Sequence, residues 1–552
     1  MPPDRPIRNI LFIMCDQLRF DYLGCTGHPH IRTPNIDRLA ARGVRFANAY
    51  CQSPVCGASR MSFYTGRYVS SHGASWNGVP LKVGEMTMGD YLRPLGMAAT
   101  LVGKTHMRAD TEGMERLGID PDSIIGVRVS ECGFDPFDRD DGLHPVGPDG
   151  RYDPNLPRYE DYLRKKGYPG DYGWQDWANG VDADDGAIGN GFAMRHAPQP
   201  ARVREEDSET PYMTRRAMEF IEEAGESRWC LHLSFIKPHW PYIAPAPYHA
   251  MYDAGDVIPL ARSDLERQDP HPVYRAFMEN RIGRSFARDE VREAVIPVYM
   301  GLISQIDDQL GLLFDFLEAR GLAGETMIVF TSDHGDYLGD HWLGEKDLFH
   351  DPSVKVPLII ADPRPGADMT RGTTSDALVE TIDLLPTFIE TAGGDAAAQA
   401  HRLEGRSLVP LLRGEPVAWR GYAISEYDYG LGGAAPALGV PPLKARLFMV
   451  TDGRWKYIHA PGFRPMLFDL TVDPQEFRDL GDHPDFAAER ERLHDALSAW
   501  GLRASQRTTR SEAQIKAMRG ASDRKGILLG IFDEGEVPAE LWTRPASSEP
   551  RD

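Results

Sequence analysis

The segment NILFIMCDQ, residues 9–17, is an unbroken apolar run that ends in two polar side chains, Asp16 and Gln17. Because apolar side chains alternate to both faces of a strand, such a run predicts a strand that is buried on both sides of a sheet. Four further apolar runs share this design and cover residues 97–102, 229–236, 326–331 and 356–360. Helical patterns separate the runs, so the sequence predicts an α/β fold with a large, mixed but mostly parallel sheet flanked by helices.

Polar side chains follow four of these five runs directly. They are Asp16 with Gln17, Lys104 with His106, His239, and Asp333 with His334. Open α/β sheets bind their ligands beyond the carboxyl ends of the strands. If the strands are parallel, we therefore expect these metal-binding and cationic side chains to converge on one site.

The composition of the chain changes twice along its length. Residues 108–200 are rich in Gly, Asp, Pro and Trp and predict an insertion over the sheet edge, which is either a lid or pocket wall or a solvated excursion. Short strand patterns at 447–451, 455–459 and 466–470 predict a small antiparallel sheet. We therefore expect an α/β catalytic domain over residues 1–400, a smaller antiparallel-sheet domain over 401–505, and a tail over 506–552.

The tail contains Ile527, Leu528, Leu529, Ile531 and Phe532. These are more apolar side chains than a free segment would expose. We expect the tail to act as an arm in a homo-oligomer, a dimer or a tetramer, with a loose tail as the alternative.

The overall composition limits the partners of the protein. The 552 residues are 41% hydrophobic and 26% charged, as in soluble globular enzymes, and the net charge of -21 makes nucleic acid a poor partner. No run of 18 apolar residues predicts a membrane span, and the apolar stretch near the start is too short for a signal peptide. The six cysteines fit neither a disulfide framework nor a zinc site, so we expect a cytoplasmic protein.

Residues 56–67, CGASRMSFYTGR, predict a short helix that begins near Cys56 and ends at Gly66. Cys56 then lies at the helix N-terminus, where free N–H groups favour an anion. Arg60 lies four residues on, on the same face, and offers donors for sulfate or phosphate oxygens. This spacing excludes the cysteine phosphatases, which place their arginine six residues after the nucleophile.

The same segment resembles the signature of type I sulfatases of the alkaline phosphatase superfamily, which is cysteine-x-proline-or-alanine-x-arginine followed by threonine-glycine-arginine. Ala58 stands where proline is more usual. The resemblance extends from Asn9 to about Leu480 and includes residues 27–50 and 453–458. It implies that a formylglycine-generating enzyme oxidises Cys56 to formylglycine, whose hydrated aldehyde is the nucleophile.

The resemblance also implies a site for one divalent metal ion. Its ligands would be Asp16, Gln17, the modified Cys56, Asp333 and His334. Oxygen ligands suit calcium or magnesium, whereas an imidazole favours metals such as manganese. We therefore expect manganese, with calcium as the alternative.

The remaining matches are side chains that would act on the substrate. Arg60, Lys104, His106 and Lys346 are expected to neutralise the non-bridging oxygens, and His239 to protonate the leaving oxygen or contact the substrate. Gln17 and His334 resemble the phosphonate monoester hydrolase branch, whereas Lys104 and His106 resemble arylsulfatases.

Together these matches predict an enzyme that hydrolyses small anionic esters. We expect arylsulfatase activity first, with promiscuous hydrolysis of phosphonate monoesters and phosphodiesters. Three alternatives stay open. They are an enzyme that is primarily a phosphonate monoester hydrolase or phosphodiesterase, a two-metal phosphatase relative, and a non-catalytic anion-binding protein with an unmodified Cys56. The phosphatase relatives use serine or threonine as nucleophile, so Cys56 argues against the second.

Overall fold

The apolar run that opens the sequence forms strand β1 (Asn9–Asp16), and every residue of it is buried. The computed structural model describes residues 5–142, 158–183, 186–506, 510–524 and 527–542. The even-numbered side chains of β1 pack into one hydrophobic core and its odd-numbered side chains into a second. The strand is therefore covered on both faces, as predicted.

Within the described residues, β1 lies inside an eight-stranded sheet of order β10-β2-β9-β8-β1-β7-β3-β4. The other strands are β2 (Val44–Tyr50), β3 (Ala98–Gly103), β4 (Asp135–Arg139), β7 (Trp229–Pro238), β8 (Thr326–Ser332), β9 (Leu358–Ala361) and β10 (Thr373–Glu380). Neighbouring strands are parallel except at β9, so the predicted mixed, mostly parallel sheet is confirmed. β9 runs antiparallel to β8 and β2, because the chain turns back after β8 without a long crossover helix.

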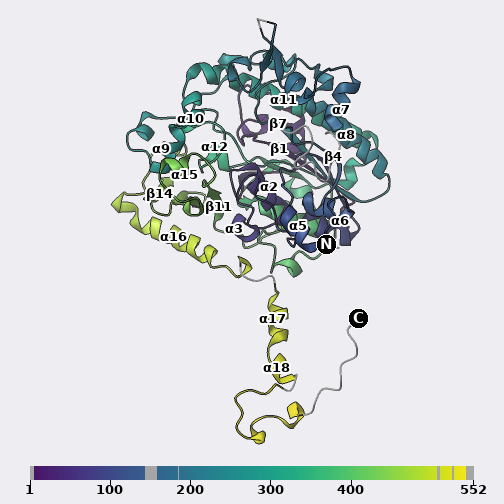
Figure 1. Ribbon diagram of the computed structural model, residues 1–552, viewed down its shortest axis with the longest axis vertical. Coiled ribbons are helices and arrows are strands. Elements are labelled where there is room, and N and C mark those ends of the chain that lie inside the picture. Colours follow the sequence, from purple (N-terminus) through teal and green to yellow (C-terminus); the bar gives the residue numbers. More distant parts are fainter. Residues whose placement is uncertain (1–4, 143–157, 184–185, 507–509, 525–526, 543–552) are drawn as a thin grey trace.

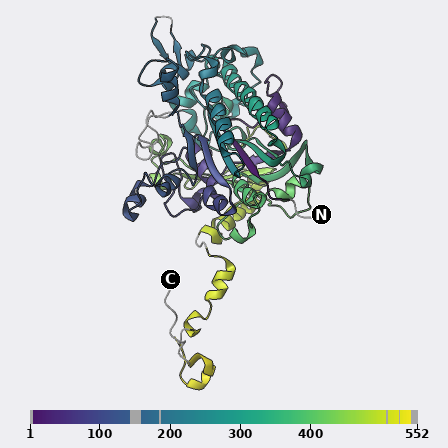
Figure 2. The same ribbon diagram turned by 90° about the vertical axis from the view of Figure 1, so that its right-hand side faces the viewer.

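Helices cover both faces of the sheet (Figures 1 and 2). The first core contains apolar residues of α2 (Cys56–Thr65), α4 (Met88–Leu92) and α13 (Leu384–Thr391). The second contains those of α1 (Pro34–Arg42), α8 (Glu209–Ala224) and the long α11 (Asp289–Ala319). The shorter helices are α3 (Val69–His72), α5 (Thr111–Leu117), α6 (Ile124–Ser130), α7 (Arg158–Lys165), α9 (Pro272–Met278), α10 (Arg281–Phe286), α12 (Asp351–Val354), α14 (Val409–Leu412) and α15 (Ala434–Ala437).

The predicted antiparallel sheet is also present. In the described part of the chain it has four strands, β11 (Ala423–Asp428), β12 (Arg446–Thr451), β13 (Trp455–His459) and β14 (Met466–Asp469). The first of these was not predicted. Leu493 and Leu497 of α16 (Ala487–Gly501) pack in the same core as this sheet. The domain boundaries at 400 and 505 stay predictions.

The predicted insertion at 108–200 is partly a piece of the main sheet, because β4 adds an edge strand beside β3. It also contains the hairpin β5 (Gly180–Asp182) and β6 (Ile188–Asn190). Residues 143–157 and 184–185 of this insertion lie outside the described residues. Whether the insertion acts as a lid stays a prediction.

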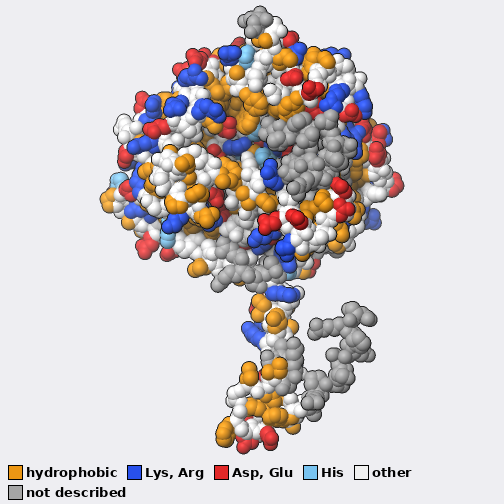
Figure 3. Space-filling view, viewed as in Figure 1, with side chains coloured by type: hydrophobic (Ala, Val, Ile, Leu, Met, Phe, Trp, Pro, Cys, Tyr) orange, Lys and Arg blue, Asp and Glu red, His pale blue; other side chains and the backbone are white. Residues whose placement is uncertain are grey.

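The segment after α16 extends away from the body (Figure 1) and carries α17 (Glu512–Met518) and α18 (Ala521–Arg524). Hydrophobic side chains are visible on its surface in Figure 3. Exposed ones include Met518, Ile527, Leu529 and Phe532. No helix in the described ranges is both long and apolar enough to cross a membrane.

Gly103, at the end of β3, provides a test of how closely the strands meet near their carboxyl ends. Its φ is 106°, and a Cβ there would lie 2.0 Å from the carbonyl oxygen of Ser234 in β7. We expect Gly103→Ala to destabilise the protein by roughly 3 kcal/mol, from left-handed strain plus overpacking. Denaturant unfolding measures this loss.

The matched control is Gly96→Ala, just before β3. Gly96 also has a positive φ of 73°, but no atom lies within 4 Å of the place that a Cβ would occupy. It should lose only about 1 kcal/mol. Equal losses for the two variants would contradict the close approach of β3 and β7.

Candidate active site

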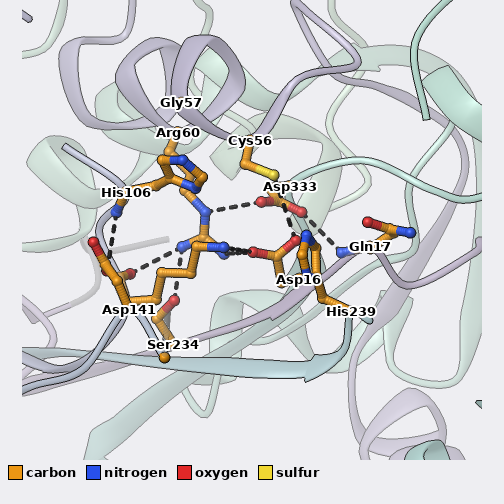
Figure 4. A network of polar contacts seen from close by, with 12 residues as sticks. Asp16, Gln17, Cys56, Gly57, Arg60, His106, Asp141, Ser234, His239 and Asp333 are labelled. Carbon is orange, nitrogen blue, oxygen red and sulfur yellow. Dashed lines mark hydrogen bonds and ion pairs between the residues drawn. The ribbon is translucent and has the colours of Figure 1, made fainter. Parts of the chain in front are cut away.

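The carboxyl ends of four parallel strands meet at one edge of the sheet. Cys15 of β1 pairs with Ser332 of β8, Asp16 with Pro238 of β7, and Gly103 of β3 with Ser234 of β7. The residues just beyond these strand ends therefore lie side by side, as expected for a binding edge of a parallel sheet. Figure 4 shows several of the predicted site residues at this edge.

Cys56 approaches this edge from the first turn of α2. It is the first residue of the helix, and Gly66 ends the helix with a φ of 65°, as predicted. The N–H of Gly57 donates to the side-chain oxygen of Asn77 at 2.8 Å, and the Ser59 hydroxyl donates to the carbonyl oxygen of Asp333 at 2.6 Å. These bonds attach the first turn of α2 to neighbouring segments, and Cys56 is completely buried.

Four side chains at this edge could hold a metal ion. Within the described residues, ligand atoms of Asp16, Cys56, Asp333 and His334 all lie within 4.8 Å of one another. Cys56 Sγ lies 3.1 Å from His334 Nε2 and 3.6 Å from Asp16 Oδ1. The other ring nitrogen of His334 lies 2.9 Å from the Gly335 carbonyl oxygen, which directs Nε2 toward the cluster.

The electrostatics of the cluster favour a cation. Burial lowers the pKa of His334, but Asp333 and Cys56 outweigh this effect and raise it to about 9. Burial also opposes ionisation of Asp16, yet Lys104 and other cations hold its pKa well below the usual range. The raised pKa of His334 shows that the cluster stabilises positive charge, and buried carboxylates with an imidazole, which ligates a metal in its neutral form, make a donor set that fits a divalent ion.

Gln17, the fifth predicted ligand, is fixed by its backbone and its side chain. Its φ is 67°, an uncommon value for a residue other than glycine. Its N–H donates to Asp333 Oδ1 at 3.0 Å, and its carbonyl oxygen accepts from the Tyr299 hydroxyl at 2.8 Å. Its side-chain Nε2 donates to Asp336 at 2.5 Å, while Oε1 lies 3.4 Å from Lys346 Nζ.

Asp336 and Tyr242 were missed in the sequence. Asp336 Oδ2 accepts from both the Gln17 amide and the Tyr242 hydroxyl, the latter at 2.7 Å, and Oδ1 accepts from the Leu338 N–H. Asp336 is completely buried and sets the orientation of the Gln17 amide. Its position three residues after Asp333 was an available signal, whereas nothing marked Tyr242.

Arg60 lies beneath the cluster with its donors engaged. Its guanidinium donates to Asp333 Oδ2 at 2.8 Å, to Asp16 Oδ2 at 3.3 Å and to the Ser234 hydroxyl at 2.7 Å. It also donates to the carbonyl oxygen of Lys104. Arg60 therefore positions two potential metal ligands, and its expected contact with substrate oxygens stays a prediction.

Lys104 and His106 follow β3 and border the same cluster. Lys104 Nζ forms an ion pair with Asp16 Oδ2 at 2.5 Å. The backbone N–H of His106 donates to Asp141, and burial together with Lys104 holds the pKa of His106 well below its usual value. A neutral His106 would offer a hydrogen bond rather than a charge.

Lys346 and His239 also lie close to Cys56. Lys346 Nζ is 2.9 Å from Cys56 Sγ and 3.2 Å from His239 Nε2. The other ring nitrogen of His239 lies 2.7 Å from the Trp240 carbonyl oxygen. Burial keeps the pKa of His239 well below its usual value. The structure thus brings together all ten predicted site residues: Asp16, Gln17, Cys56, Arg60, Lys104, His106, His239, Asp333, His334 and Lys346.

Comparison with known families identifies the class of protein that contains this site. The model of the Sulfatase family matches residues 8–394, and that of the N-sulphoglucosamine sulphohydrolase C-terminal region matches residues 339–502. The chain belongs to the sulfatase family, within the alkaline phosphatase superfamily.

Several characterised proteins are similar over nearly their whole length. The multifunctional alkaline phosphatase superfamily protein PehA of Trinickia caryophylli is 32% identical, over 91% of this chain and 96% of its own. An arylsulfatase of Clostridium perfringens is 28% identical, over 89% and 93%. The phosphonate monoester hydrolase SpPMH of Silicibacter pomeroyi has a TM-score of 0.77 at 28% identity, over 91% and 96%. The chain is therefore a hydrolase of sulfuric ester or phosphonate monoester bonds.

The Asp336 carboxylate should control the affinity of the metal site through Gln17. We expect Asp336→Ala to weaken binding of a divalent ion about 10- to 100-fold, the usual effect of losing a group that orients a ligand. Titration calorimetry of metal-depleted protein with Mn²⁺ measures affinity and should give one ion per chain. Tyr242→Phe is the comparison variant, since it removes one donor to Asp336 and a longer 3.4 Å contact with Gln17 Nε2 but leaves the Gln17–Asp336 bond, so it should lose less affinity. Unchanged affinity in folded Asp336→Ala would refute this role.

Proposed function

We propose that this protein is primarily an arylsulfatase that also hydrolyses phosphonate monoesters and phosphodiesters. The observation that carries the proposal is the position of Cys56, at a helix N-terminus within contact of His334 and Lys346. The similar proteins support the same range, since PehA is described as multifunctional and the other two are an arylsulfatase and a phosphonate monoester hydrolase.

The proposed nucleophile is formylglycine made from Cys56. Because Cys56 is completely buried, we expect the formylglycine-generating enzyme to act before the chain has folded. One hydroxyl of the hydrated aldehyde would attack the sulfur or phosphorus atom, and the alcohol would leave with a proton. The second hydroxyl would then lose its proton as the carbon–oxygen bond to the sulfate or phosphonate breaks, which restores the aldehyde. Water rehydrates it.

A divalent ion would be held by Asp16, Gln17, Asp333 and His334 with the modified Cys56. Such an ion lowers the proton affinity of a bound hydroxyl and orients it. The imidazole among the ligands favours manganese, with calcium as the alternative.

Cationic side chains of the protein would act on the non-bridging oxygens and on the leaving oxygen of the ester. Lys104, beside Asp16, and Lys346, beside Cys56, flank the position of the nucleophile and would neutralise the non-bridging oxygens. His239 faces the same space through Nε2, which accepts from Lys346. A leaving oxygen beside Lys346 would be stabilised by its ammonium group, and protonation by His239 would first require Nε2 to take up a proton.

Cys56→Ala should lose activity by at least roughly 10³-fold, because the loss of a catalytic nucleophile usually costs far more than a binding contact. The rate of aryl sulfate hydrolysis measures this loss, with circular dichroism to show that the variant is folded. Cys230→Ala is the control, since Cys230 is equally buried but lies near the start of β7, away from the site. Near-normal turnover by Cys56→Ala would overturn the mechanism.

The proposed order of substrates follows from charge. Sulfate monoesters, phosphonate monoesters and phosphodiesters each carry one negative charge, so one pocket can accept all three with small discrimination. For esters that share one aryl leaving group, we expect kcat/KM to be highest for the sulfate ester and somewhat lower for the phenylphosphonate ester. Phenylphosphonate as the best substrate would favour the alternative of a phosphonate monoester hydrolase, which the Gln17–His334 pair supports. A clear preference for the phosphate monoester would refute both.

The six cysteines are all unpaired in the structure, which supports the proposal of a reducing, cytoplasmic location. The exposed apolar side chains beyond α16 support the proposal of a homo-oligomer, a dimer or a tetramer.

Deletion of residues 507–552 should therefore lower the molar mass in solution. Light scattering of the full chain and of the truncated chain measures the change. Deletion of residues 543–552 alone is the control, because it leaves Leu529 and Phe532 in place. A full-length protein that is already monomeric would contradict the proposed role of the arm.

A further inference from the structure

A cavity of about 590 Å³ lies beside the active site, and its size is typical of small-molecule pockets. Among the described residues, its wall includes Phe192 and Met194 from the insertion, Trp240 and Tyr242 from the loop after β7, and Phe286 of α10. These segments come together only in the folded protein. The pocket is therefore a product of the tertiary structure.

The cavity adjoins the reacting groups on the side of His239. The ring of Trp240 lies against the ring of His239, with centroids 4.5 Å apart. His239 Nε2 is 3.2 Å from Lys346 Nζ, which is 2.9 Å from Cys56 Sγ. Glu345, which lines the cavity, directly precedes Lys346. A group bound in the cavity would thus extend from the bond that breaks.

The side chains that line the cavity favour ligands that make apolar contacts over charged ligands. Phe192 and Trp240 meet edge to face at 5.5 Å, and Tyr242 and Phe286 do so at 6.3 Å. Of the two ionisable lining residues, Arg281 is exposed to solvent, and burial raises the pKa of Glu345 to about 7. Aromatic walls favour a flat apolar partner, and the hydroxyl groups of a sugar that face these walls would lack hydrogen-bond partners there.

We propose that this cavity binds the leaving group, and that the enzyme acts on esters of neutral aromatic alcohols rather than on sulfated sugars. The proposal rests on the arylsulfatase function proposed above and adds the place in the fold where its aryl group binds. Phe192 is then a residue that determines specificity. Its side chain is 44% exposed, so it can be shortened without opening the core.

The experiment compares the wild type with Phe192→Ala and Phe192→Tyr. Turnover is measured with 2-naphthyl sulfate and with N-acetylglucosamine 6-sulfate, and calorimetry measures binding of free 2-naphthol, which needs no catalysis. Ile188→Ala is the matched control, because Ile188 is similarly exposed on the same insertion but does not line the cavity.

We expect Phe192→Ala to weaken naphthol binding and to lower kcat/KM for naphthyl sulfate about tenfold through KM, with Phe192→Tyr near wild type. Turnover of the sugar sulfate should be low and unchanged. Equal naphthol binding by wild type and Phe192→Ala, or an equal loss on the sugar ester, would overturn the proposal. A wild type that binds naphthol through Phe192 but hydrolyses no sulfate or phosphonate ester would instead refute the proposed function.

Discussion

The buried ion pairs of Arg60 with Asp16 and Asp333 are the interaction on which the rest of the site depends. These two carboxylates come from β1 and from the residue after β8, and they are completely buried. Two buried carboxylates without partners would repel each other and would lose their charge. Arg60 pairs with both carboxylates and fixes their positions, and Lys104 adds a second cation at Asp16. The protein thus has two carboxylates in fixed positions before any ion binds.

The same helix that carries Arg60 also carries Cys56, one turn earlier. Anchoring the guanidinium between the two strands therefore places the nucleophile position beside His334 and Lys346. Strand pairing, the short helix α2 and the ion pairs restrict one another, so the geometry does not rely on flexible loops. The apolar cavity at Phe192 and Trp240 lies beyond His239. The charged group of a substrate would therefore bind at the strand ends, and its apolar group would bind in the cavity.

Short-range patterns explain what could be predicted from the sequence. The strand ends at Asp16, Lys104 and Asp333 are marked by local apolar runs, and the helix after Cys56 by its spacing and by Gly66. The antiparallel course of β9 depends on a long connection without a local signature. The bonds of Asp336 to Gln17 and of Arg60 to Ser234 join segments 319 and 174 residues apart. The cavity at Phe192 and Phe286 is likewise assembled from distant segments, which is why the sequence pointed only to the insertion.

The central claim is that Cys56 becomes the nucleophile by oxidation to formylglycine. The most direct test is the mass of the tryptic peptide 46–60, which contains Cys56, from protein made together with a formylglycine-generating enzyme. The account predicts a peptide in which the thiol of Cys56 has been replaced by an aldehyde, in proportion to the specific activity. A fully active protein whose peptide carries only the unmodified thiol would contradict it, and an inactive thiol form that still binds sulfate would identify an anion-binding protein instead.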